Sequence, residues 1–250
     1  LDPVPGGIWG LTPIPVVAIA GAILLPLALL PPVAEPQRFQ TLADGRSFFG
    51  IANFVNVVSN VPFLVVGVWG LRFVARNAAN GQVFARPSER WAYVVCLLAV
   101  ALTAFGSSYY HLDVDSSGLF WDRLPMGIGF MGLFAAVIVE RIDARLGLLL
   151  LVPLIVFGAG SVMYWRWTGN LLPYGLAQYG SIAAVLILCA VYRSRYTRGA
   201  DVVHVIVIYA LAKVTEVLDA RIYALGEIIS GHTLKHLIAA GATYWLLRML

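Results

Sequence analysis

Charged residues are scarce in this sequence, and their scarcity decides its class. Only 12% of the 250 residues are charged and 60% are hydrophobic, whereas soluble domains average roughly 25% and 45–50%. The mean hydropathy is +0.83. This balance excludes an ordinary soluble protein and predicts an integral membrane protein that crosses the bilayer several times.

Cysteines, repeats and polar tracts are also few. Cys96 and Cys189 both fall inside apolar runs, where a buried thiol behaves as a small hydrophobic residue, so we expect no disulfide. The sequence has no internal repeat or low-complexity tract, which argues against a repeat protein or a second soluble domain. It begins at Leu1 without a methionine, and we therefore expect a trimmed chain.

The small excess of positive charge has two possible interpretations. A net charge of +4 could suggest a nucleic-acid partner. However, the basic residues lie in short loops beside apolar runs, where they act as topology signals. We therefore expect no nucleic-acid partner.

Eight apolar runs are long enough to cross a bilayer, since a hydrocarbon core about 30 Å thick needs roughly 20 helical residues. They lie at about 12–33, 48–74, 91–111, 120–139, 146–163, 173–192, 202–222 and 231–250. The sequence thus predicts an all-α transmembrane bundle. The first run is rich in proline, which interrupts helical hydrogen bonds, so we expect it to be kinked or partly interfacial.

Arginines predict the orientation of the bundle, because cytoplasmic loops retain an excess of positive charge. The loops after the second, fourth and sixth runs share one side and carry Arg72, Arg76, Arg86, Arg90, Arg141, Arg145, Arg193, Arg195 and Arg198. The opposite side carries fewer. Both termini are therefore predicted to be cytoplasmic.

Three of the four histidines fall at one predicted depth, on the non-cytoplasmic side. His232 and His236 are four residues apart, so a helix would present both on one face as two ligands for one metal. His111 ends the run 91–111 and could supply a third ligand, leaving an open position as in catalytic zinc. Alternatively, the histidines only hydrogen-bond to neighbouring helices. His204 begins a run on the opposite side and is expected to be interfacial.

Two further polar residues fall at the depth of these histidines. Asp122 lies near the start of the run 120–139 and could act as a general base beside the metal. It could instead pair with Arg123 or serve as a helix N-terminal carboxylate. Ser107 precedes His111 by four residues, which places it on the same helical face. A serine in a membrane helix often bonds to its own backbone, so its register with His111 is what makes it a candidate.

Polar residues also interrupt the second and seventh predicted helices. Interhelical hydrogen bonds and ion pairs would account for them, and Lys213 and Glu216 could pair on one helix. Glu216 and Asp219 lie nearer the proposed metal and could support its ligands. The full set is Asn53, Asn56, Ser59, Asn60, Lys213, Glu216 and Asp219.

Four polar segments form an ordered set: 53–60, 106–111, 121–126 and 231–236. They contain the sequences NFVNVVSN, GSSYYH, WDRLPM and GHTLKH. With them the chain resembles the alkaline ceramidases and the wider superfamily of seven-helix membrane hydrolases and progestin- and adiponectin-type receptors. The resemblance spans about 44–248. It implies a seven-helix domain, 48–250, preceded by an extra transmembrane helix and loop, 1–47.

The resemblance also implies roles for the site residues. The zinc ligands would be His111, His232 and His236, with Asp122 acting on the water and Ser107 hydrogen-bonding near the reacting carbonyl. Animal members bind calcium through an acidic segment, whereas this chain offers only Glu35 and Asp44 there and has Asn53 in place of a glutamate. Calcium dependence is therefore not expected. The segment around 44–48 looks more like the bacterial branch, which suggests an inner membrane.

The expected function is zinc-dependent hydrolysis of a ceramide-like N-acyl lipid to a fatty acid and a long-chain amino alcohol. The substrate would enter sideways from the bilayer. Two alternatives stay open at this point. One is a hydrolase of a different N-acyl lipid, and the other is a receptor-like or structural metal-binding protein.

Overall fold

The computed structural model describes residues 21, 25–27, 29–35 and 41–250. Over these residues the chain is helical and contains no strand. The helices are α2 (Phe54–Val58), α3 (Val61–Arg76), α4 (Arg90–Leu112), α5 (Ser116–Arg141), α6 (Ala144–Thr168), α7 (Leu172–Gly175), α8 (Ser181–Val191), α9 (Asp201–Val217), α10 (Asp219–Tyr223) and α11 (Gly231–Met249). A 3₁₀ turn at Pro87–Glu89 precedes α4, and a π-helical turn at Leu176–Gly180 joins α7 to α8.

The observed helices follow the predicted apolar runs from residue 48 onward. Five helical stretches are long and apolar enough to cross a membrane: Phe54–Arg76, Pro87–Leu112, Ser116–Arg141, Ala144–Thr168 and Leu172–Val191. The protein is therefore an integral membrane protein with an all-α fold. The predicted first helix, 12–33, lies largely outside the described residues.

The helices differ from the sequence prediction at several points. The run 48–74 is interrupted at Ser59 and Asn60, between α2 and α3. The run 202–222 is interrupted at Leu218, between α9 and α10. Helix α5 begins at Ser116 rather than near 120, because Asp115 caps it by accepting a hydrogen bond from the Gly118 amide. Polar capping residues thus extend α5 beyond its apolar run.

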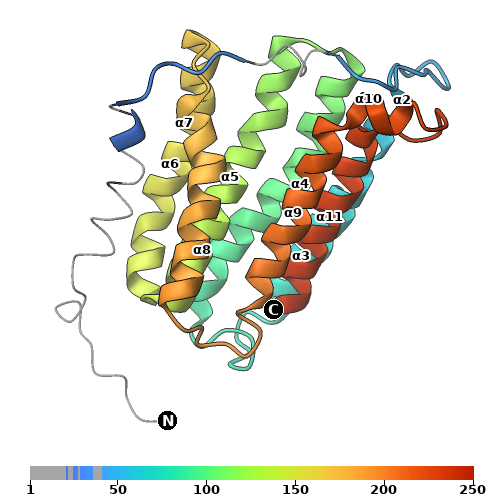
Figure 1. Ribbon diagram of the computed structural model, residues 1–250. Coiled ribbons are helices and arrows are strands. Elements are labelled where there is room, and N and C mark those ends of the chain that lie inside the picture. The colour runs from blue at the N-terminus through green and yellow to red at the C-terminus, as the bar shows by residue number, and fades with distance from the viewer. Residues whose placement is uncertain (1–20, 22–24, 28, 36–40) are drawn as a thin grey trace.

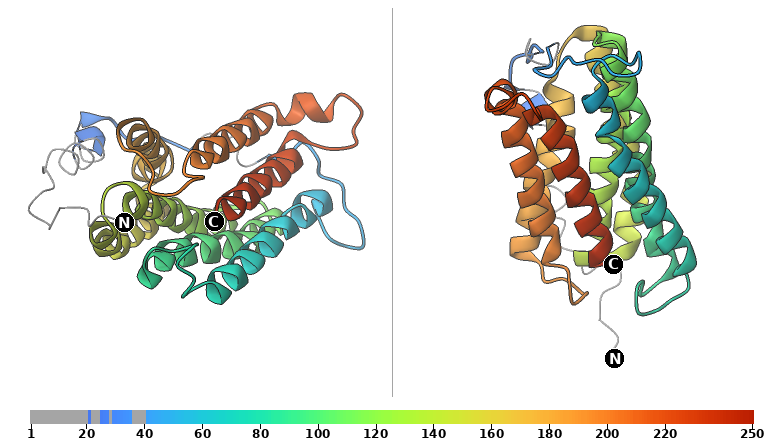
Figure 2. Two further views of the ribbon diagram at one scale, coloured as in Figure 1. Left: turned by 90° about the horizontal axis from the view of Figure 1, so that it is seen from below. Right: turned by 90° about the vertical axis from the view of Figure 1, so that its right-hand side faces the viewer.

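The long helices run roughly along a common direction, and α3, α4, α5 and α6 each lie beside the next (Figures 1 and 2). Helix α11 packs against α9 and α3, so the end of the chain returns to the first described helices. Small residues bring neighbouring backbones close together. A Cβ added to Gly67 would lie 2.6 Å from the Ala101 amide nitrogen, and one added to Gly127 would lie 2.9 Å from the Gly158 carbonyl oxygen. Such contacts replace the hydrophobic drive that is missing between helices in lipid.

Polar side chains tie the loop 192–200 to the end of the bundle where α5 finishes and α4 begins. Ser194 donates to Glu140 and Tyr196 donates to Glu89, and both carboxylate residues are buried. Arg141 donates to the carbonyls of Tyr192 and Gly199, each at 2.7 Å. Partial burial raises the pKa of Tyr196 to about 12. We call this set of contacts the polar clasp.

Candidate metal centre

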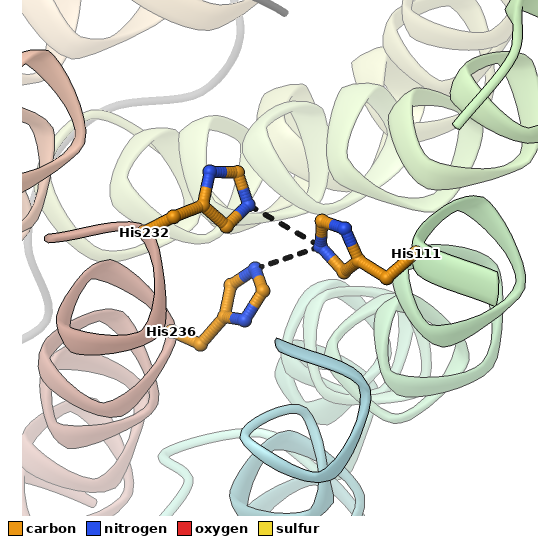
Figure 3. A group of neighbouring side chains, drawn as sticks. All are labelled: His111, His232 and His236. Carbon is orange, nitrogen blue, oxygen red and sulfur yellow. Dashed lines mark hydrogen bonds between the residues drawn. The ribbon is translucent and has the colours of Figure 1, made fainter. Parts of the chain in front are cut away.

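The three predicted histidines converge at one point, at the end of the bundle opposite the polar clasp. His111 comes from the last turn of α4, and His232 and His236 come from the start of α11. The Nε2 atom of His111 lies 3.3 Å from Nε2 of His232 and 3.3 Å from Nε2 of His236. Figure 3 shows the three rings facing one another across the gap between the two helices. All three side chains are buried.

Local structure fixes the two histidines of α11. Ser230 caps this helix by accepting from the Thr233 amide at 3.1 Å. The His232 amide donates to Asp219 Oδ1 at 2.7 Å. Asp219 also accepts from the Ala43 amide through its other oxygen, at 3.0 Å. The predicted supporting role of Asp219 therefore corresponds to a contact with the backbone of His232 rather than with its ring.

Ser59 is a contact that sequence reasoning did not assign to the site. Its Oγ lies 2.7 Å from Nδ1 of His236 and donates to the Asn56 carbonyl at 2.8 Å. A hydroxyl has one hydrogen, so Ser59 must accept from Nδ1–H of His236. This assigns the tautomer that leaves the Nε2 lone pair of His236 facing the other histidines. The polar positions in the apolar run 48–74 were the available signal.

His232 and His111 are held by contacts of different kinds. Lys235 Nζ lies 2.9 Å from Nε2 of His232. An ammonium can only donate, so Nε2 of His232 also presents a lone pair. His111 is held through its backbone, where Asn53 donates to its carbonyl at 2.9 Å, while its buried Nδ1 has no hydrogen-bond partner.

The donor set and its spacing fit a zinc ion. Neutral imidazole is a common zinc ligand, and zinc–nitrogen bonds of about 2.0–2.1 Å in a tetrahedron place the nitrogens about 3.3–3.4 Å apart. The two Nε2 separations at His111 are both 3.3 Å. The three histidines could therefore hold a metal ion.

Asp122 and Ser107 lie beside this centre, as predicted. Ser107 Oγ is 3.3 Å from Nε2 of His111, and the buried Asp122 carboxylate lies within hydrogen-bonding reach of Ser107. Because α5 starts at Ser116 and is capped by Asp115, Asp122 lies beyond the first turn. The alternative of a helix N-terminal carboxylate is therefore wrong for Asp122.

Other charged residues near the centre form ion pairs. Arg123 pairs with Glu35 at 3.1 Å and lies over the ring of Trp165. Lys213 pairs with Glu216, as predicted. Glu216 also accepts from Lys235, at 3.1 Å.

Asp44, in the loop before α2, forms a salt bridge with Arg46 at 2.7 Å. Its carbonyl accepts from Asn56 at 2.9 Å. The hydrogen bond from the Arg46 side chain lowers the pKa of Asp44 below its ordinary value. The acidic residues that were compared with a calcium-binding segment, Glu35 and Asp44, are thus both engaged by arginine.

A cavity of about 350 Å³ opens beside the histidines. Its polar wall includes Ser107, Asp122, His232 and His236, and most of the remaining lining is apolar. An adjoining apolar cavity of about 130 Å³ shares Phe63, Thr103, Met126, Tyr209 and Ala239 with it. The polar centre therefore lies next to apolar space between the helices.

His204 lies far from this centre. It is in the first turn of α9, at the end of the bundle that carries the polar clasp. Its side chain is 63% exposed and lies 3.7 Å from Asp201. The prediction that it stands apart from the other three histidines is confirmed.

Comparison with known proteins gives one family match. The model of the family described as Ceramidase matches residues 48–249, which include the three histidines, Asp122 and Ser107. No curated protein matches the chain. Because the match covers most of the sequence, the chain belongs to the ceramidase family.

Proposed function

We propose that this protein is a zinc-dependent intramembrane hydrolase that cleaves the amide bond of ceramide-like N-acyl lipids. Family membership implies a hydrolase acting on amide bonds. The observation that carries the zinc-dependent mechanism is the convergence of three buried Nε2 atoms, from His111, His232 and His236. The products would be a free fatty acid and a long-chain amino alcohol.

His111, His232 and His236 would hold the ion. Zinc in such a site supplies a Lewis acid that polarises the amide carbonyl and acidifies water. His236 is oriented for coordination by Ser59, and His232 by the hydrogen bond from its amide to Asp219. Orientation by such neighbours sets ligand geometry and metal affinity.

Asp122 is the general base in this proposal. It lines the cavity beside Ser107 and the histidines. Its carboxylate would take a proton from the attacking water and pass it to the departing amine. The Ser107 hydroxyl would hydrogen-bond near the reacting carbonyl. The apolar lining of the two adjoining cavities would bind the hydrocarbon chains of the substrate.

A combined measurement of metal content and turnover tests the proposal. Purified protein should contain about one zinc per chain, and His232→Ala should lose it, since two imidazoles make a poor site. His204→Ala removes a histidine at the other end of the bundle and should keep both zinc and activity. Incubation with a mixed N-acyl lipid extract, with and without a zinc chelator, should show chelator-sensitive loss of ceramide-like species. Absence of zinc under metal-replete conditions would refute the mechanism.

Asp122→Asn separates chemistry from binding. A general base typically contributes about 10²–10⁴-fold, so turnover should fall within that range while zinc content is unchanged. If Asp122 instead supported a ligand, metal affinity should fall by about 10–100-fold, and added zinc should restore activity. If it served only folding, the folded yield should fall with little change per folded molecule. Near-normal turnover with zinc bound would exclude Asp122 from catalysis.

The two alternatives make different predictions in the same assays. A hydrolase of another N-acyl lipid would consume different species from the extract, and a receptor-like protein would bind zinc without turnover. We also propose a bacterial inner membrane, with both termini cytoplasmic and the metal centre toward the other side. The arrangement of arginine-rich loops supports this orientation.

A further inference from the structure

Lysine is used only twice in this chain, and both lysines lie near the metal centre. The sequence has fifteen arginines but only Lys213 and Lys235. Both line the cavity of about 350 Å³, and their side chains are only 25% and 16% exposed. An ionisable group within a membrane is costly, and its presence usually marks a function. Arginine suits planar paired contacts, whereas an ammonium is a compact point charge.

Lys235 points at the reacting centre and is anchored there from a second helix. It lies between the two histidines of α11, and its Nζ is 2.9 Å from Nε2 of His232. The same Nζ donates to Glu216 Oε1 on α9 at 3.1 Å. Glu216 therefore ties the ammonium to a second helix at the edge of the histidine cluster, and a zinc ion on Nε2 of His232 would take the lone pair that accepts from Lys235 in this structure.

The charge of Lys235 is not fully cancelled by its partner. Glu216 contacts both lysines, one through each carboxylate oxygen, so this group of three carries a net positive charge. Asp122 is the other carboxylate among the described residues that line the cavity. In the proposed reaction it becomes neutral by accepting a proton, at the stage when negative charge develops on the substrate carbonyl oxygen.

Amide hydrolysis creates an anion twice. As water oxygen adds to the carbonyl carbon, the electron pair of the C=O double bond moves to oxygen and forms an oxyanion. When the C–N bond breaks, its electron pair leaves on nitrogen, which takes up the proton held by Asp122. The fatty acid then gives its own proton to the free amine and departs as a carboxylate. A fixed cation in a site shielded from water stabilises such charge more strongly than water does.

We propose that Lys235 is a catalytic residue whose ammonium binds the oxyanion and then the fatty-acid carboxylate. This inference rests on the proposed hydrolase function and deepens it, because it assigns an anion-binding group to the same cavity. Lys235 acts through charge and hydrogen bonding. Glu216 is a positioning residue, since it reaches the substrate only through Lys235.

The test compares an acid with a neutral ligand of the same chain. Binding of dodecanoic acid and dodecanol would be measured on zinc-loaded protein in nanodiscs, alongside zinc content and steady-state kinetics. Lys235→Met should lower the acid affinity at least about 10-fold, leave the alcohol affinity unchanged, and lower kcat by about 10²–10³-fold, the usual loss of an oxyanion donor. Zinc stoichiometry should be unchanged.

A matched control and a second variant keep the test decisive. Arg198→Met also removes one cation that pairs with a carboxylate, here Asp201, but at the other end of the bundle, and should keep the acid preference. If Lys235→Met does not fold, Lys235→Gln removes the charge while retaining a donor for Glu216, and the same loss of acid preference is expected.

The outcomes separate this inference from the proposed function. An unchanged acid preference in a folded Lys235 variant would overturn the inference, even if the wild type hydrolyses N-acyl lipids. A preference that depends on Lys235 would support the anion site even in a wild-type protein without turnover, in which case the hydrolase proposal fails instead. If the contact between Lys235 and Glu216 only joined α9 and α11, Lys235→Met would lower stability and leave the ratio of acid affinity to alcohol affinity unchanged.

Discussion

At Gly106, α4 and α5 approach each other closely beside the metal centre. The variant Gly106→Ala tests whether turnover depends on that approach. A Cβ at this position would lie 2.8 Å from the Trp121 carbonyl carbon and closer still to its oxygen. Gly106 precedes Ser107, and Trp121 precedes Asp122. The two helices that carry the serine and the proposed base therefore meet through backbone at this glycine.

The displacement can be estimated from these contacts. An ordinary contact of a Cβ begins near 3.4 Å, so the carbonyl carbon alone requires a separation of about 0.6 Å and the nearer oxygen requires more. The cost is typical of overpacking, about 1–3 kcal/mol. Each kcal/mol lowers the unfolding temperature by about 2–4 °C for a chain of this size. A misplacement approaching 1 Å at reacting groups can reduce turnover by about 10²-fold.

The assay measures turnover, zinc content and unfolding temperature on Gly106→Ala and on a control. Gly160→Ala is matched because Gly160 lies within α6 with no atom near the added Cβ. We expect turnover to fall by about 10–100-fold in Gly106→Ala with zinc retained at saturation. Gly160→Ala should behave as wild type. Wild-type turnover in Gly106→Ala would show that the approach of Ser107 to Asp122 does not control the reaction.

Three other predictions concern the ligands, the loop before α2 and the topology. Ser59→Ala should weaken zinc affinity by about 10–100-fold in competition with a chelator, and an unchanged affinity would exclude Ser59 as the group orienting His236. Because the hydrogen bond from Arg46 lowers the pKa of Asp44, it stabilises the fold above the ordinary carboxyl value of 3.8 and is lost as pH falls through the lowered pKa. Asp44→Asn should therefore be less stable near neutrality and show a smaller loss in acid, as followed by thermal unfolding. With both native cysteines removed, a single cysteine at Glu227 but not at Asn80 should react with an impermeant reagent on intact cells, and the reverse pattern would overturn the orientation.

The helices and the histidine cluster were predictable from sequence because each depends on short-range patterns. A helix that crosses a membrane must satisfy its own backbone groups and present apolar side chains to lipid, so its length is visible as an apolar run. The spacing of His232 and His236 follows from helix geometry. Counting crossings was then enough to bring His111 to the same depth.

The contacts that orient the site were not predictable in the same way. Ser59 and His236 are 177 residues apart in sequence, and their pairing depends on how α11 packs against the first helices. The break at Ser59 and Asn60 is hidden within one apolar run, and the start of α5 is hidden by polar capping residues. In the sequence, Lys235 is one more charged residue near the end of a helix. Only the packing of α9 against α11 shows that Glu216 lies beside it.

The polar clasp makes the two ends of the bundle mechanically different. Buried hydrogen bonds from the loop 192–200 join it to α4 and α5 at one end, and separating those elements would leave buried polar groups unpaired. If a lipid substrate enters from the side, we expect it to part the helices at the other end, beside the π-helical turn at Leu176–Gly180 that lines the cavity. The helices would then stay together at the clasp and separate at the end that carries the metal centre. Amide hydrogen exchange should accordingly be slow in α4 and α5 next to the clasp and faster around residues 172–180.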